Sequence, residues 1–155
     1  IAVKRPDPVM FLEYWNRPEA TREKFIQTPL GDWMVTGDQG EMDGEGYVRF
    51  IGRDDDVITS SGYRIGPGEI EDCLLRHPAI ANAAVVGKKD TLRTEIVKAF
   101  VVLRAGVAPS DTLVADLQSF VRARLAAYEY PREIAFVDSL PLTTSGKVIR
   151  RLLRE

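Results

Sequence analysis

The stretch from Gly52 to Glu71 constrains the fold more than any other part of this 155-residue chain. It follows a strand-like segment, 47–51, and runs through three consecutive aspartates at 54–56. Like charges this close repel one another, so they favour a solvated connection over a buried strand. Glycines follow at 62, 66 and 68, where they permit a positive φ or a close approach of the backbone to a ligand. We interpret the stretch as a hinge followed by a binding turn.

Composition and charge narrow the class of protein. The chain has a hydrophobic content of 45% and a charged content of 28%, which are typical of a globular protein. Its net charge of −2 lacks the positive excess expected of a nucleic-acid-binding protein. Residues 38–56 hold seven acids and two bases, whereas residues 147–155 hold four bases and one acid. The single cysteine, Cys73, excludes an internal disulfide. No apolar run approaches about 18 residues, so no membrane span is predicted.

The pattern of apolar residues predicts different structures on the two sides of the hinge. Before it, prolines separate one short helix at 18–25 from strands at 33–36, 40–42 and 47–51, with a hairpin turn at 43–46. After it, we expect a helix at 69–77, strands at 80–86 and 95–103, and a second helix that begins at Ser110. A third strand at 133–137 and a last helix at 147–154 follow. Apolar residues on both faces of the strand at 95–103 predict that it is covered on both sides. The order predicts a small α+β domain, a sheet with packed helices.

Three motifs occur in order along the chain. They are Thr36-Gly37-Asp38, the hinge pattern from Gly52 through Ile65, and Pro141-Leu-Thr-Thr-Ser-Gly-Lys147. Together they resemble the adenylate-forming enzymes over roughly residues 30–150, and they are most similar to acyl-CoA synthetases of the short- and medium-chain fatty-acid type.

The resemblance implies a division of the chain. Residues 1–54 correspond to the end of the large N-terminal domain of such an enzyme, and residues 55–155 to its mobile C-terminal domain. The phosphate loop and acyl-pocket motif of that large domain are not in this sequence, and the first residue is Ile1. We therefore expect the C-terminal part of a longer acyl-CoA synthetase, inactive alone and cytoplasmic, or in the mitochondrial matrix of a eukaryote.

The resemblance also implies residues that contact the nucleotide. Asp38 and Arg53 match residues that hold the ribose, and Arg64 matches an arginine that contacts nucleotide phosphate. Asp55 matches the hinge residue, about which the small domain turns. Consecutive aspartates point their side chains apart and no EF-hand spacing follows them, so we expect Mg²⁺ to arrive with ATP rather than bind the protein.

Further matches concern CoA and the first chemical step. Ser61, Gly62 and Tyr63 correspond to the turn that meets CoA, and Arg93 falls where relatives contact CoA phosphate. Lys147 is the predicted catalytic residue, because a lysine can stabilise the negative charge that builds when a carboxylate attacks the α-phosphorus of ATP. The implied partners are a small carboxylic acid, ATP, CoA and the missing N-terminal domain.

The sequence also admits other interpretations. A Walker P-loop fails because Pro141 replaces its first glycine and Val148 its magnesium-binding hydroxyl residue. His77 is expected to cap or pack a helix end, and Cys73 to lie in the core. An aryl-CoA ligase, a peptide-synthetase adenylation domain and a non-catalytic binding module of the same fold remain alternatives.

Overall fold

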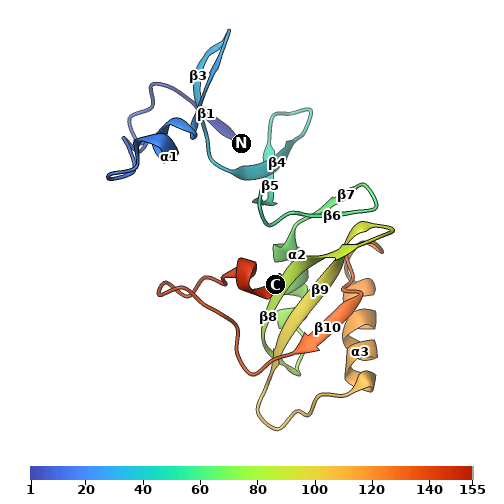
Figure 1. The fold of residues 1–155 in the computed structure, drawn as a ribbon. Helices are drawn as coiled ribbons and strands as arrows, with labels where there is room; N and C mark the ends of the chain where they lie inside the picture. The colour runs from blue at the N-terminus through green and yellow to red at the C-terminus, as the bar shows by residue number, and fades with distance from the viewer. Residues whose placement is uncertain (155) are drawn as a thin grey trace. The chain divides into compact units, whose positions relative to one another are not determined.

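The computed structural model describes residues 1–154 (Figure 1). The chain forms two compact units, Ile1–Asp55 and the residues from Asp56 onward. The division falls one residue after the predicted domain boundary between 54 and 55. Each unit is described separately below.

The first unit begins with a three-stranded antiparallel sheet in the order β1-β3-β2. Its strands are β1 (Ala2–Lys4), β2 (Phe25–Thr28) and β3 (Gly31–Val35). Helix α1 (Pro18–Arg22) precedes β2, and Pro18 opens its first turn as predicted, because an N-terminal helical residue needs no amide donor. Strands β1 and β2 were not predicted, since both are short and adjoin proline-rich sequence.

Strands β4 (Asp38–Met42) and β5 (Val48–Arg53) form an antiparallel hairpin. The Asp43 carboxylate closes its turn by accepting from the amides of Glu45 and Tyr47, each at 2.9 Å. The hairpin predicted around 43–46 is therefore confirmed. Its register pairs Asp38 with Arg53, which brings two predicted site residues to the same end of the ladder.

The second unit contains a five-stranded sheet centred on β9 (Thr94–Leu103). β8 (Ile80–Asp90) pairs antiparallel with β9 along its length, and β10 (Glu133–Phe136) pairs parallel with it. β6 (Ile58–Ser60) meets the start of β9 through the pair Ser60 and Thr94, and β7 (Tyr63–Ile65) pairs with β6. Figure 1 shows α3 running beside this sheet.

Two helices complete the core of this unit. α2 (Pro67–Leu75) and α3 (Asp111–Arg122) contribute buried side chains to the same cluster as the sheet. Its fully buried members include Ile70, Leu74, Leu117, Val121, Val85, Ala99 and Val101. Burying a valine, leucine or isoleucine side chain stabilises the fold by about 1.5–3 kcal/mol. The α+β class predicted from the sequence is confirmed.

The prediction that both faces of the 95–103 strand are covered is only partly right. Val97, Ala99 and Val101 are at most 2% exposed and face the helices. Ile96, Phe100 and Val102 on the other face are half-buried. That face also carries Lys98, whose charged end requires access to solvent or a partner.

Two elements differ from the prediction. The turn expected at 61–63 joins two strands, β6 and β7, which are too short to show a strand period. The helix expected at 147–154 is instead a loop followed by a 3₁₀ helix, η1 (Arg150–Leu153). The reason is that the Lys147 carbonyl accepts from the Thr143 amide at 2.8 Å instead of from a later helical residue, and Ile149 has a ψ of 79°, outside the helical region.

Within residues 1–154, no helix is both long and apolar enough to cross a membrane.

Candidate functional site

The β4–β5 hairpin brings Asp38 and Arg53 together. Arg53 Nη1 lies 3.5 Å from Asp38 Oδ1 and 3.4 Å from the Thr36 carbonyl oxygen. The Asp38 side chain is 30% exposed, and its backbone amide donates to Thr36 Oγ1 at 3.1 Å. A carboxylate in this position is fixed by its neighbours but open to solvent, so it can accept hydrogen bonds from a pair of adjacent hydroxyls.

Gly37 is required by the backbone and by the space beside it. Its φ is +83°, a region that side chains with a Cβ rarely adopt. A Cβ built at Gly37 would lie 3.3 Å from Arg53 Nη2. A side chain here would therefore strain the turn and crowd the guanidinium that contacts Asp38.

The three aspartates at the unit boundary have three different sets of partners. Asp54 accepts a hydrogen bond from the side-chain amide of Gln39, and Asp55 lies 3.4 Å from Arg53 Nε with its side chain 72% exposed. The Asp56 side chain is only 15% exposed and binds Arg150 and Arg154. The prediction of a solvated connection is therefore wrong for Asp56, because two arginines compensate its charge. None of the residues 1–154 form a group of three or more metal-ligating side chains.

The turn predicted to meet CoA is the tip of the β6–β7 hairpin. Ser60 pairs with Tyr63, which leaves Ser61 and Gly62 as a two-residue loop. Their φ values are +50° and +85°, the combination that a type I′ turn requires. A Cβ at Gly62 would meet nothing within 4 Å, so within this unit the glycine is required by the turn's backbone and not by crowding.

A backbone hydrogen bond joins this turn to the loop between β8 and β9. The Ser61 amide donates to the Arg93 carbonyl oxygen at 3.0 Å. The Asp90 carboxylate fixes the loop by accepting from the amides of Leu92 and Arg93, at 3.0 and 2.8 Å. Two predicted CoA-contacting positions, Ser61 and Arg93, are thus neighbours although they are far apart in sequence.

Tyr63 and Arg64 lie on β7, just after the turn, and both are exposed. The Tyr63 ring stacks on Tyr128, with centroids 4.1 Å apart and planes 10° from parallel. Tyr128 was not among the predicted site residues. No period or spacing in the sequence links Tyr128 to the β6–β7 turn.

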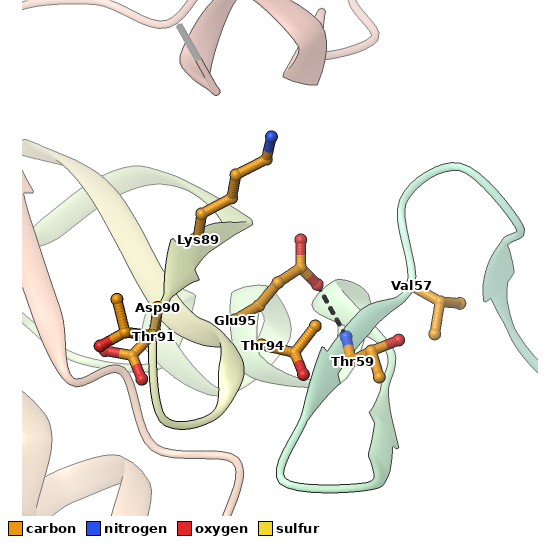
Figure 2. A pocket seen from close by; sticks show the side chains of 7 residues that line it. All are labelled: Val57, Thr59, Lys89, Asp90, Thr91, Thr94 and Glu95. Atoms are coloured by element: carbon orange, nitrogen blue, oxygen red, sulfur yellow. Dashed lines mark hydrogen bonds between the residues drawn. The ribbon is translucent and has the colours of Figure 1, made fainter.

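A surface pocket of about 680 Å³ lies beside the two joined loops (Figure 2). Within it, Glu95 Oε2 accepts from the Thr59 amide at 2.8 Å, and Lys89 extends away from its strand. A Cβ at Gly87 would lie 2.6 Å from the Glu95 carboxylate, so the glycine makes room for this contact. The pocket is lined by Val57, Thr59, Lys89, Asp90, Thr91, Thr94 and Glu95.

Lys147 lies on a closed, exposed loop. The Thr143 amide donates to the Lys147 carbonyl at 2.8 Å, and the Lys147 amide donates to Thr143 Oγ1 at 3.0 Å. Leu142 and Val148 form a bridge, and the Ile149 amide closes the base of the loop on Pro141. The backbone around Lys147 is therefore ordered by its own hydrogen bonds while the lysine side chain remains exposed.

The structure brings some of the predicted residues together and not others. Asp38 pairs with Arg53 in the first unit, and Ser61 contacts Arg93 in the second. Figure 1 shows the Lys147 loop on the opposite side of the second unit from the β6–β7 turn. The second unit therefore carries the predicted site residues on two separate surfaces.

His77 and Cys73 have structural roles, as predicted. His77 is 7% exposed, and its Nδ1 accepts from the Ala79 amide at 3.2 Å, which fixes the turn that follows α2. Its Nε2 lies 3.1 Å from Asp116 Oδ2 on α3. Cys73 is 4% exposed, and burial raises the pKa of its thiol, which makes it a poor nucleophile.

Comparison with known proteins identifies the family. The family model described as AMP-binding enzyme C-terminal domain matches residues 69–147. The chain belongs to this family of C-terminal domains of AMP-binding enzymes. The resemblance found in the three sequence motifs is confirmed at that level.

Curated relatives and solved structures agree with this assignment. An acetyl-coenzyme A synthetase of Bacillus subtilis is 50% identical over 99% of the chain and 26% of its own length. A mitochondrial acyl-coenzyme A synthetase of Homo sapiens is 46% identical over the whole chain and 27% of its own length. The chain thus spans about a quarter of these relatives.

Among solved structures, a benzoate CoA ligase from Burkholderia xenovorans LB400 aligns with a TM-score of 0.73 at 42% identity, covering 93% of the chain and 28% of the ligase. An anthranilate CoA ligase in complex with anthranoyl-AMP aligns with a TM-score of 0.77 at 38% identity, covering 92% of the chain and 27% of the ligase.

Proposed function

We propose that the chain is the C-terminal part of an AMP-forming acid–thiol ligase, an acyl-CoA synthetase. In the first step, a carboxylate oxygen attacks the α-phosphorus of ATP, an acyl-adenylate forms and pyrophosphate leaves. In the second step, the CoA sulfur, having lost its proton, attacks the acyl carbonyl carbon and AMP leaves. Mg²⁺ accompanies the nucleotide in the first step.

Lys147 serves the first step in this proposal. Its exposed ammonium stands on a loop closed by its own hydrogen bonds, so the backbone that carries it is ordered before substrate binds. A positive charge held in a fixed position stabilises the charge that develops between the carboxylate and the α-phosphate. Asp38 accepts from the ribose hydroxyls, Arg53 orients Asp38 and contacts the ribose, and Arg64 contacts phosphate.

The Ser61–Gly62–Tyr63 turn and Arg93 serve the second step. The bond between the Ser61 amide and the Arg93 carbonyl makes one surface of two loops. CoA carries several phosphates and a long pantetheine arm, so it is suited to a surface that combines an arginine with an open turn. Lys147 belongs to another side of the unit, so the two steps need different orientations of it.

The observation that carries the proposal is the boundary between the two compact units. It falls between Asp55 and Asp56, beside the residue that the resemblance implies as the hinge. A rotation at a single exposed residue can present two surfaces of the second unit in turn, since hinges are a few positions that absorb a change in φ and ψ.

Exposed apolar side chains of the first unit favour a longer parent enzyme in which another domain buries them. Val9, Leu12 and Trp15 are 84–91% exposed. Apolar groups gathered on one segment favour burial against another surface. We propose that the large N-terminal domain of the same chain covers them, in a cytoplasmic or mitochondrial-matrix enzyme.

The test uses the full-length parent protein and measures ATP–pyrophosphate exchange with short-chain, medium-chain and aromatic acids. We expect acid-dependent exchange, and a loss of about 100-fold or more in Lys147→Ala. Arg151→Ala is the control, because it removes an exposed positive charge from the neighbouring helix η1. Exchange that survives in Lys147→Ala would refute the role of the lysine. If none of the acids supports exchange in the wild type, a non-catalytic module is favoured.

An aryl-CoA ligase is the second candidate. Two of the similar solved structures are named as benzoate and anthranilate ligases, at 42% and 38% identity. The curated acyl- and acetyl-CoA synthetases are more similar, at 46–50%. The aromatic acids in the exchange panel separate the two candidates.

A further inference from the structure

A partly buried ion-pair network joins the end of the chain to the start of the second unit. Arg150 Nη1 donates to Asp56 Oδ2 at 3.1 Å, and its Nη2 donates to both carboxylate oxygens of Glu71 at 2.9 and 2.8 Å. Arg154 donates to Asp56 Oδ1 at 2.8 Å. The side chains of Arg150, Asp56 and Glu71 are 14–21% exposed. This network was not predicted from the sequence, where Arg150 was assigned to a basic helix.

The network is fixed at both ends by secondary structure. Glu71 lies on α2, and its Oε1 also accepts from the Val85 amide of β8 at 2.8 Å. Arg150 is the first residue of η1. Burial alone would lower the pKa of its guanidinium, but the hydrogen bonds and charges of Glu71 and Asp56 outweigh this and leave the pKa raised. The arginine is therefore a permanently charged centre between two carboxylates.

Arg150 also stands at the base of the loop that carries Lys147. It directly follows Ile149, whose amide closes that loop on the Pro141 carbonyl. On its other side it holds Asp56, the first residue after the proposed hinge. The guanidinium thus joins two segments that are 94 residues apart.

We propose that Arg150 is a positioning residue that fixes the base of the Lys147 loop to the segment leaving the hinge. This rests on the proposed function. When the unit turns at Asp55, the loop then turns with Asp56 as one body, and Lys147 reaches the nucleotide in a single orientation. Without Arg150, the Arg154 contact with Asp56 would remain, but Arg154 follows η1 and lies farther along the chain from the base of the loop.

The proposal predicts a selective effect on the two chemical steps. The Ser61–Gly62 turn is held by the Arg93 carbonyl, and Tyr63 by its stacking on Tyr128. Neither contact involves Arg150. Loss of the guanidinium should therefore loosen the base of the Lys147 loop, where the Ile149 amide bonds to Pro141, and slow adenylation, while the surface proposed for CoA stays intact.

The test compares Arg150→Met with Arg150→Lys and the exposed control Arg151→Met in the full-length enzyme. Adenylation is followed by ATP–pyrophosphate exchange, and thioester formation by transfer from preformed acyl-adenylate to CoA. In Arg150→Met we expect the kcat of exchange to fall about 100-fold, because small misplacements of a catalytic group cost rates of this order. The KM for ATP and the transfer step should be unchanged. Arg150→Lys should recover part of the rate, since it keeps the charge but not the planar fork.

A second readout does not depend on the reaction. Hydrogen exchange of the amides at 143–149 should be faster in Arg150→Met, and that of the amides at 61 and 63 unchanged. Arg150→Met leaves two carboxylates without their partner, so a triple variant with Asp56→Asn and Glu71→Gln removes the charges together and should show the same loosened loop. The proposal would be overturned if the rates of both half-reactions fell equally in Arg150→Met. It would also be overturned if hydrogen exchange of the loop amides were as slow as in the wild type. A wild type that adenylates no acid would refute the proposed function, while hydrogen exchange still tests the contact itself.

Discussion

Gly62 and Gly87 are glycines for different physical reasons. Gly62 has φ +85° in a two-residue turn, and a Cβ there would meet nothing within 4 Å. At Gly87 a Cβ would lie 2.6 Å from the Glu95 carboxylate, which must pass over the strand to reach the Thr59 amide. Gly62 is required by its backbone conformation, and Gly87 is required because there is no room for a Cβ. Substitutions can therefore distinguish the two reasons.

Gly62→Ala should destabilise the second unit by about 1–2 kcal/mol, because alanine at a left-handed backbone position is strained. Gly68→Ala is the matched control, since Gly68 lies in α2 without a positive φ and with equally open space. Urea unfolding of the two variants measures the difference. Gly62→Asn should lose less than alanine, because asparagine tolerates this conformation. Equal losses at 62 and 68 would contradict the assignment of a type I′ turn.

Asparagine at 62 also separates folding from catalysis in the parent enzyme. It should preserve the hairpin while placing a side chain on the surface proposed for CoA. We expect slower thioester formation with normal ATP–pyrophosphate exchange. Normal rates in both steps would remove the turn from the proposed CoA surface.

At the scale of the elements, three strands share one cross-strand ion-pair cluster. Glu133 on β10 forms ion pairs with Lys88 of β8, 2.5 Å away, and with Lys98 of β9, 2.6 Å away. Hydrogen bonds from Lys88 and then Lys98 lower the pKa of Glu133. A carboxyl group with a lowered folded pKa stabilises the fold above its unfolded pKa, and this contribution disappears as the pH falls through the folded value.

Glu133→Gln should therefore be less stable than the wild type at neutral pH. The difference in unfolding free energy should shrink as the pH falls below about 4.3, the ordinary glutamate value. Urea unfolding at a series of pH values measures it, with Asp138→Asn, an exposed carboxylate of the same unit, as the control. A difference that does not change with pH would show that packing and not charge explains the effect.

The start of α3 depends on a single side chain. Ser110 precedes the helix and its Oγ accepts from the Leu113 amide at 3.1 Å. Ser110→Ala should cost about 1 kcal/mol, because it leaves a first-turn amide without its partner. Ser119→Ala on the exposed face of the same helix should be neutral or slightly stabilising, since alanine favours helix. Urea unfolding of the two variants gives the comparison, and similar losses would argue against the cap.

The sequence predicted the long elements of the second unit because their periods extend over many residues. Ile70, Cys73, Leu74 and His77 lie on one face of α2 and its end, and all are buried as that spacing predicts. Strands β6 and β7 have three residues each and show no period. The turn between them was predicted as a binding site, but the two strands that make it a hairpin were not predicted. The Arg150 network could not be predicted, because its partners are separated by 79 and 94 residues and no local pattern links them.

For the whole molecule, the two units differ in what can stabilise them. Every buried apolar side chain of the core belongs to the second unit, from Ile58 onward, and none of the apolar side chains in residues 1–55 is fully buried. A unit without a core depends on other surfaces for its stability. The second unit should therefore unfold separately from the first.

The distribution of tryptophans makes this measurable. Both tryptophans, Trp15 and Trp33, lie in the first unit, whereas the two longer helices, α2 and α3, lie in the second. In urea, tryptophan fluorescence should change at lower concentration than the helical far-UV circular dichroism. Residues 56–155 expressed alone should keep the later, cooperative transition. Coincident transitions in the intact chain would show that the two units are coupled.

The hydrogen bond between Ser61 and the Arg93 carbonyl has a consequence for how such a domain can diverge. Two hairpin tips that meet through one backbone bond must both keep their length, since an added residue in either would separate them. The exposed connection at 104–110 has no such constraint, and surface connections ordinarily tolerate insertions. Related sequences should therefore differ in length at 104–110 and keep the same length at 61–62 and 91–93.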